Sequence, residues 1–95
     1  MPRFSTHPTP NPNSLKFTVD DDASFIEEGM ESFNTAQEAA EDPIGQRLFA
    51  VQGVENVFIM PEFVTVSKHP AADWNALEPQ LRQALSDYFE DRDQG

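Results

Sequence analysis

The chain has 95 residues and a formal net charge of −11, from 17 acidic and six basic residues, and 38% of its residues are hydrophobic. This length supports one domain with a single core, and the charge disfavours binding to nucleic acid or to an anionic membrane because phosphates would be repelled. The absence of cysteine excludes disulfides, thiolate metal sites and a cysteine nucleophile from these residues.

No apolar run approaches the roughly 18 residues that a membrane-spanning helix needs. The N-terminal stretch MPRFSTHPTP also lacks the apolar centre of a signal peptide. We therefore expect a soluble, intracellular protein, located in the cytoplasm.

Prolines dominate the first segment, so residues 1–13 are predicted to form an extended arm. The alternating pattern of SLKFTV predicts a strand over Ser14–Val19. A weaker strand is predicted over Phe25–Asn34, where Gly29 indicates a bulge or bend. Met30 and Phe33 are expected to be available for packing.

Two helix-start signals follow this strand. Thr35 and Glu38 match a capping box, which predicts a short helix. Asp42-Pro43 then restarts the helix, with Asp as the N-cap and Pro at the first helical position. Gly53 is predicted to close this helix in a left-handed cap.

The second half of the chain reads as a hairpin and a helix. The strands VENVFIM (Val54–Met60) and FVTVSK (Phe63–Lys68) are joined by the short turn Pro61-Glu62. Asp73 is predicted to cap a final amphipathic helix, and the tail at residues 91–95 is expected to fray.

The predicted element order is ββαββα in a single domain over residues 1–95. Hairpin-joined strands favour a mainly antiparallel sheet of four strands with the helices on one face, a two-layer α+β sandwich. The order of the strands in the sheet stays open.

The charge is concentrated in one part of the sequence. From Phe17 to Gln46 there are nine acidic residues and no Lys or Arg. This block is either a solvated surface that gives solubility, or a site for a cation or a basic partner.

Patterns for metal binding are weak in this sequence. Asp20, Asp22, Ser24 and Glu31 fit positions of a calcium loop, but Phe25 stands where that loop needs glycine. His7 and His69 could join a carboxylate in an iron site, although 62 residues separate them along the chain.

Catalytic patterns are absent from the sequence. No serine lies in a nucleophile elbow, no histidine has an evident carboxylate partner, and no glycine-rich phosphate loop is present. We therefore expect that the protein is not an enzyme.

Three stretches resemble the N-terminal domain of Nfu/NifU-type iron–sulfur cluster scaffold proteins. They are TPNPNSLKF (Thr9–Phe17), DPIGQRLFAVQGVENVFIMPEFVTVSK (Asp42–Lys68) and DWNALEPQLRQAL (Asp73–Leu85). The resemblance implies a role in iron–sulfur cluster assembly or delivery, with iron–sulfur carriers or recipient proteins as partners. In many relatives a second domain with a C-x-x-C pair follows, whereas this chain stops at Gly95 without a cysteine.

Because these residues supply no thiolate, we expect that they hold no cluster alone and that any iron is weakly bound through oxygen donors. The resemblance and the acidic block together nominate Asp20, Asp22, Glu27 and Glu28 as metal ligands, with His7 as a neighbour. No oligomeric state can be inferred.

Two interpretations of the proline-rich arm stay open. The prolines fix the positions of Asn11 and Asn13, whose side chains satisfy local backbone groups in the simpler interpretation. In the other, Asn11, Pro12 and Asn13 form a docking surface beside the turn Met60, Pro61 and Glu62.

Two functional hypotheses result. The first is a non-catalytic accessory or adaptor in iron–sulfur cluster assembly or delivery, with weak iron binding. The alternative is a generic acidic protein-interaction module with no iron role, whose binding weakens steeply with salt.

Overall fold

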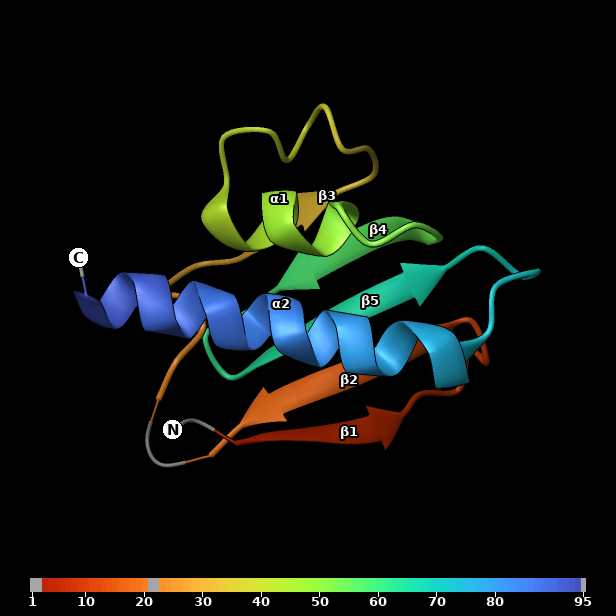
Figure 1. Ribbon diagram of the computed structural model, residues 1–95, viewed down its shortest axis with the longest axis horizontal. Coiled ribbons are helices and arrows are strands. Elements are labelled where there is room, and N and C mark those ends of the chain that lie inside the picture. Colours follow the sequence, from red (N-terminus) through yellow and green to blue (C-terminus); the bar gives the residue numbers. More distant parts are fainter. Residues whose placement is uncertain (1–2, 21–22, 95) are drawn as a thin grey trace.

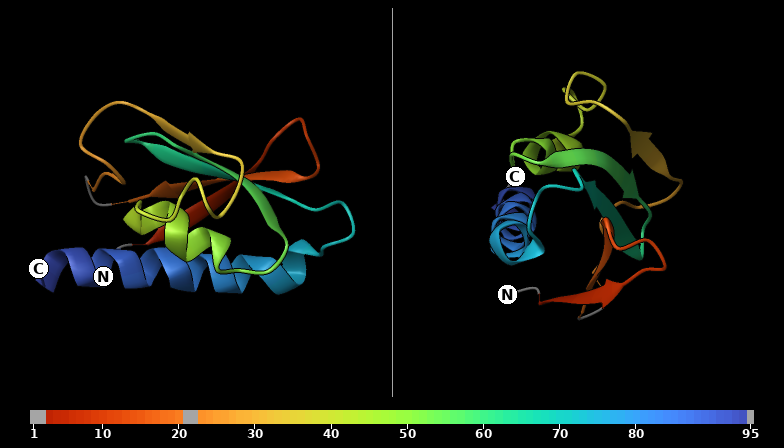
Figure 2. Two further views of the ribbon diagram at one scale, coloured as in Figure 1. Left: turned by 90° about the horizontal axis from the view of Figure 1, so that it is seen from above. Right: turned by 90° about the vertical axis from the view of Figure 1, so that its right-hand side faces the viewer.

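The computed structural model describes residues 3–20 and 23–94. Five strands form one antiparallel sheet in the order β1-β2-β5-β4-β3. Their bounds are β1 (Phe4–Pro8), β2 (Ser14–Val19), β3 (Glu31–Phe33), β4 (Val54–Ile59) and β5 (Phe63–Lys68). Helices α1 (Pro43–Phe49) and α2 (Trp74–Gln94) lie on the same face of the sheet, so the α+β two-layer class is confirmed (Figures 1 and 2).

The prediction of an extended arm over residues 1–13 missed a strand, β1. Residues Phe4–Pro8 are extended, but they pair with β2 in a register that places Phe4 opposite Val19 and Pro8 opposite Leu15. The sheet therefore has five strands rather than four. Proline had argued against a strand, but at the end of an edge strand its missing N–H removes no bond of the sheet interior.

Strand β3 is much shorter than the predicted strand over Phe25–Asn34. Only Glu31–Phe33 pairs with β4, and the preceding residues form a series of bends in which Gly29 has a φ of +82°. Phe33 packs against the core as expected, whereas Met30 is 67% exposed. The bends bring Phe25 into the core, where it is fully buried.

The capping box at Thr35 begins turns rather than a helix. Glu38 N donates to Thr35 Oγ1, and Glu38 Oε1 accepts a bond from Asn34 N. The following residues form turns up to Glu41, and α1 begins at Pro43 after its N-cap Asp42. Each side chain satisfies a free N–H as the motif predicts, but no helical ladder follows it.

The Asp42-Pro43 start of α1 is confirmed. Asp42 Oδ1 accepts bonds from Ile44 N at 2.9 Å and Gly45 N at 2.7 Å, and Pro43 occupies the first turn. The helix ends at Phe49 with Ala50 as its C-cap. Gly53 has the predicted positive φ, +108°, but it turns the chain into β4 instead of capping α1.

Helix α2 begins after Asp73, whose Oδ1 accepts a bond from Asn75 N. It continues to Gln94, through residues that were expected to fray. Within the described part of the chain, neither helix is long and apolar enough to cross a membrane.

The core lies between the sheet and the two helices. It combines the inward residues of β2, β4 and β5 with one stripe of each helix. Its largest fully buried side chains are Phe17, Phe25, Phe89, Ile44, Leu48, Ile59, Leu81, Leu85, Val57, Val64 and Val66. This core fills the space between the helices and one face of the sheet, and in the described part of the chain no helix covers the opposite face (Figure 2).

Candidate docking surface

The bends before β3 and the β4–β5 turn enclose a shallow surface hollow of about 620 Å³. We call it the methionine hollow. It is lined by Ser24, Glu27, Glu28, Gly29, Met30, Met60, Pro61 and Glu62. It joins two carboxylates nominated for metal binding with the nominated docking turn Met60-Pro61-Glu62.

Hydrogen bonds to backbone carbonyl groups hold the segments that line the hollow in place. Phe25 N donates to Pro61 O at 2.9 Å, which ties the bends to the turn. Tyr88 Oη donates to Phe25 O at 3.1 Å, and Arg92 Nη1 donates to Ser24 O at 2.7 Å, so α2 fixes the same segment. The buried Phe25 ring, 5.7 Å from the Phe89 ring, anchors it further.

Met30 and Met60 form the apolar part of the hollow. The β3–β4 pairing ends at Glu31 and Ile59, so Met30 and Met60 are the residues that directly adjoin its last pair, and both line the hollow. Because Ile59 is buried against the helices, its neighbour Met60 belongs to the open face of the sheet. Among the described residues, Met30 stands out as an exposed large hydrophobic side chain.

Two half-buried aromatic rings share that open face. Val57, Ile59 and Val64 are buried, so the alternation of β4 and β5 directs Phe58 and Phe63 away from the helices. Their ring centroids are 6.1 Å apart, and Lys16 Nζ lies 4.7 Å from the centre of the Phe63 ring. The open face thus carries apolar side chains on the two strands that lead into the hollow.

The other nominated docking residues are occupied by internal bonds. Asn11 Oδ1 accepts from Asn13 N at 2.9 Å, and Asn13 Oδ1 accepts from Lys68 Nζ at 3.1 Å. Trp74 Nε1 donates to Pro12 O at 3.0 Å. These contacts favour the simpler interpretation, in which the Asn side chains satisfy groups of the fold.

The two nominated docking segments lie at opposite ends of the sheet. The β2–β5 register pairs Ser14 with Ser67 and Thr18 with Phe63, so residues 9–13 meet the end of β5 and the Pro61-Glu62 turn meets its start. A six-residue strand spans roughly 17–20 Å. The expectation that the proline-rich segment lies beside the Met60-Pro61-Glu62 turn is therefore wrong.

The nominated metal ligands are not gathered at one place. His7 lies near the end of β1, opposite Lys16 and with Nε2 at 3.1 Å from Thr18 Oγ1, whereas Asp20 lies beside Arg3 at the start of β1, with Asp20 N donating to Arg3 O at 2.9 Å. Glu27 and Glu28 line the hollow instead, and Asp22 lies outside the described residues. Among the side chains that the structure describes, in residues 3–20 and 23–92, no group of three or more His, Asp or Glu could hold a metal ion.

Sequence reasoning missed a contact between Glu31 and Asp42. A hydrogen bond with Asp42, then burial, then repulsion by the Asp42 charge raise the pKa of Glu31 to about 7. The two carboxyl groups meet because β3 leads to the turns that end at the α1 cap. No signal in the sequence shows this pairing, since it depends on where the turns return the chain.

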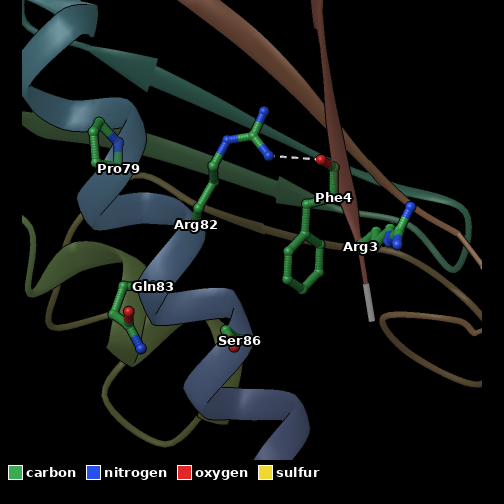
Figure 3. A pocket seen from close by; sticks show the side chains of 6 residues that line it. All are labelled: Arg3, Phe4, Pro79, Arg82, Gln83 and Ser86. Carbon is green, nitrogen blue, oxygen red and sulfur yellow. Dashed lines mark hydrogen bonds between the residues drawn. The ribbon is translucent and has the colours of Figure 1, made fainter. Parts of the chain in front are cut away.

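A second hollow, of about 600 Å³, lies between β1 and α2 and is lined by Arg3, Phe4, Pro79, Arg82, Gln83 and Ser86. Figure 3 shows the Arg82 guanidinium turned toward the carbonyl of Phe4, to which Nη1 donates. Arg82 Nε also lies 3.8 Å from Glu78 Oε2. Arg82 therefore fastens the edge strand β1 to α2, which is a structural role.

Residues 4–92 match the protein family described as "Scaffold protein Nfu/NifU N terminal". The chain belongs to this family. The resemblance carried by Thr9–Phe17, Asp42–Lys68 and Asp73–Leu85 is therefore confirmed.

Named relatives of this Nfu/NifU N-terminal domain agree with the assignment. The NFU1 iron-sulfur cluster scaffold homolog of Homo sapiens is 39% identical over 87 residues, which cover 90% of this chain and 34% of that protein. NifU-like protein 5 of Arabidopsis thaliana is 33% identical and is covered over 30% of its length. The chain thus spans about a third of the curated relatives that it matches.

Solved structures support the fold. The solution structure of a NifU-like protein from Saccharomyces cerevisiae matches with a TM-score of 0.76 at 25% identity, over 90% of this chain and 76% of that one. A crystal structure of a Staphylococcus aureus protein matches with a TM-score of 0.68 at 24% identity, over 84% of this chain and 93% of that one. The latter likeness concerns the fold alone.

The expectation of a cytoplasmic location is wrong, because the curated relatives are named as mitochondrial proteins. Absence of an N-terminal apolar segment was a poor guide, since it tests for secretion and not for other destinations.

The side chains of this Nfu/NifU domain do not fit the direct ligation of an iron–sulfur cluster. Such clusters are held by cysteine thiolates, with histidine as an occasional substitute. The sequence has no cysteine and two histidines; His7 Nε2 lies 3.1 Å from Thr18 Oγ1, and His69 Nδ1 accepts a bond from Ala71 N. Any thiolate ligand has to come from outside these residues.

Proposed function

We propose that this domain is a non-catalytic adaptor in iron–sulfur cluster assembly or delivery, which docks on proteins that carry or receive clusters. The observation that carries the proposal is membership of a scaffold family in residues that contain no cysteine. A domain of this kind contributes by binding another molecule, because it brings no thiolate of its own.

The methionine hollow supports this proposal. Its two sides are fixed by bonds to α2 and to the β4–β5 turn, so a partner meets a surface that is already formed. A preformed surface reduces the entropy lost when the partner binds.

The test is an affinity pull-down from native lysate under anaerobic conditions, repeated with an iron chelator. The proposal predicts enrichment of cluster carriers or apo forms of cluster enzymes over a control domain of similar charge. Capture of basic proteins without any relation to clusters would contradict it.

A second candidate is an acidic interaction module without an iron role, and the acidic rim of the hollow favours it. Long-range attraction between charges weakens with salt, so this module would lose its partners at high ionic strength. Its binding would be indifferent to chelator and to the cluster content of the partner.

Weak iron binding by carboxylates is a separate prediction. Of the nominated ligands, Glu27 and Glu28 share the hollow, and the net charge of −11 attracts cations. Anaerobic calorimetry with Fe(II) should give binding heat that disappears in Glu27→Lys/Glu28→Lys. Equal heats for the two proteins would contradict a role for this carboxylate pair.

A further inference from the structure

We infer that the methionine hollow binds a partner segment in which a large apolar side chain is flanked by Lys or Arg. The inference deepens the proposed function, because it names the chemistry that a cluster carrier or recipient would have to present there. It rests on three features: the exposed Met30 beside the half-buried Met60, the carboxylate rim and the open face of the sheet beside them.

The apolar feature consists of Met30 and Met60, which directly adjoin the last residue pair of β3 and β4, Glu31 and Ile59, and both line the hollow. Met30 is 67% exposed, while other large hydrophobic side chains of the described chain are buried or half-buried. Methionine is flexible and polarizable, which suits surfaces that adapt to an apolar side chain. An exposed apolar surface with a polar rim is typical of an interaction site.

The charged feature consists of Glu27, Glu28 and Glu62. All three are exposed and line the same hollow as the methionines. Carboxylates at the rim of a contact speed the association of a partner that carries Lys or Arg, and they repel a partner that carries acidic residues. The apolar floor and acidic rim together select a basic, apolar segment.

The open face extends the contact along the sheet. Phe58 lies in β4, two residues before Met60, which directly follows that strand, and the centroid of the Phe58 ring is 6.1 Å from that of Phe63 in β5. Lys16 Nζ lies 4.7 Å from the centre of the Phe63 ring, so Phe63 already contacts a cation of this chain and Phe58 is the ring of this pair that we assign to the partner. The covered apolar area would then run from Met30 across Met60 to Phe58.

Charge argues against a second copy of this chain as the occupant. Each copy carries a formal net charge of −11, and a contact between two hollows would place six carboxylates around one small apolar surface. Like charges brought together in this way repel. The hollow therefore fits a different, basic molecule.

The probe is a synthetic peptide with a central Leu-Trp-Leu flanked by two lysines on each side. Binding is followed in the full chain by the ε-methyl resonances of Met30 and Met60, with affinity from the titration. We expect both resonances to shift at saturation and the peptide in which glutamates replace the lysines to bind at least tenfold more weakly. A replacement of Leu-Trp-Leu by three alanines should weaken binding to a similar degree.

Matched variants distinguish binding at the hollow from attraction by the net charge of the whole chain. Glu27→Lys/Glu28→Lys should weaken peptide binding by about tenfold, and Met30→Gln by about fivefold. The control Glu41→Lys/Glu55→Lys changes the net charge by the same amount at two exposed residues outside the hollow, and it should change affinity by less than twofold. Because all these side chains are exposed, folding is checked by an unchanged melting temperature.

Two results would overturn the inference. One is an equal loss of peptide affinity in the hollow variants and in the control variant. The other is peptide binding that leaves the methyl resonances of Met30 and Met60 unchanged. Its failure is distinguishable from failure of the proposed function. Capture of cluster proteins with no dependence on Glu27 and Glu28 refutes the inference alone. Peptide binding at the hollow without capture of any cluster protein refutes the proposed function alone.

Discussion

The Glu31 carboxyl group lies beside the Asp42 carboxylate that caps α1, and this contact raises the pKa of Glu31 to about 7. In the folded chain Glu31 therefore keeps a proton at pH values where the unfolded chain has released it. Stability that depends on this proton is complete below about pH 4.5 and is lost as pH rises through about 7.

The first prediction concerns Glu31→Gln, which keeps a neutral donor beside Asp42 at every pH. Its free energy of unfolding should be higher than that of the wild type at pH 8, by about 1 kcal/mol once solvent screening is allowed for. Urea unfolding at pH 5, 6, 7 and 8 measures the difference. Glu41→Gln is the control, and parallel pH profiles for the wild type and Glu31→Gln would refute the pairing.

A second residue-scale prediction concerns Asn13, whose side chain accepts a bond from Lys68, a cation that is only 7% exposed. Asn13→Ala should lower the free energy of unfolding by about 1–3 kcal/mol, because a buried donor loses its partner. The affinity for the captured partner should not change. The opposite pattern, in which affinity falls and stability holds, would restore residues 11–13 as a docking surface.

Helix α1 shows how an element depends on its neighbours. Gly45 lies inside the helix, and a Cβ there would come 2.8 Å from Ala39 Cβ and 3.1 Å from the Phe33 ring. Neither neighbour can shift easily to make room, because Ala39 is fully buried and Phe33 packs against the core.

The corresponding prediction is that Gly45→Ala destabilises the chain by about 1–3 kcal/mol through overpacking. In an exposed helix the same change would stabilise by about 1 kcal/mol. Thermal unfolding gives the sign directly. A raised melting temperature would contradict the prediction and would mean that the turns before α1 shift to make room for the added methyl group.

Sequence patterns predicted the elements whose signals are local. Strand β2 and the β4–β5 hairpin alternate over six residues each, and Asp42-Pro43 caps α1 where expected. Strand β1 was missed because Pro8 suggested an arm, although the edge of a sheet tolerates proline. Strand β3 was overextended because Phe25 looked like a strand residue when it is a core residue of a bend.

The candidate site was predicted only in pieces. Glu27, Glu28 and Met60 were nominated separately, as metal ligands and as a docking turn. Their meeting depends on the bond from Phe25 N to Pro61 O, which joins segments far apart in the sequence. Asn11 and Asn13 were predicted as docking residues on their local sequence pattern alone. That pattern cannot show that Lys68 and Trp74, which are far away in the sequence, donate hydrogen bonds to Asn13 and Pro12.

The molecule as a whole has two unlike faces. Helices α1 and α2 cover one face of the sheet (Figure 2), and the methionine hollow lies where β4 ends and β3 begins. Arg82 and Pro8 protect the β1 edge against further strand pairing. A partner is therefore expected on the open face rather than on the helices or the β1 edge.

Hydrogen–deuterium exchange of the chain, alone and bound to the cluster protein that it captures, tests this account most directly. We predict slower exchange in Ser24–Met30 and in Met60–Phe63, with α1, α2 and the 9–13 loop unchanged. Protection confined to the helices or to the 9–13 loop would contradict it.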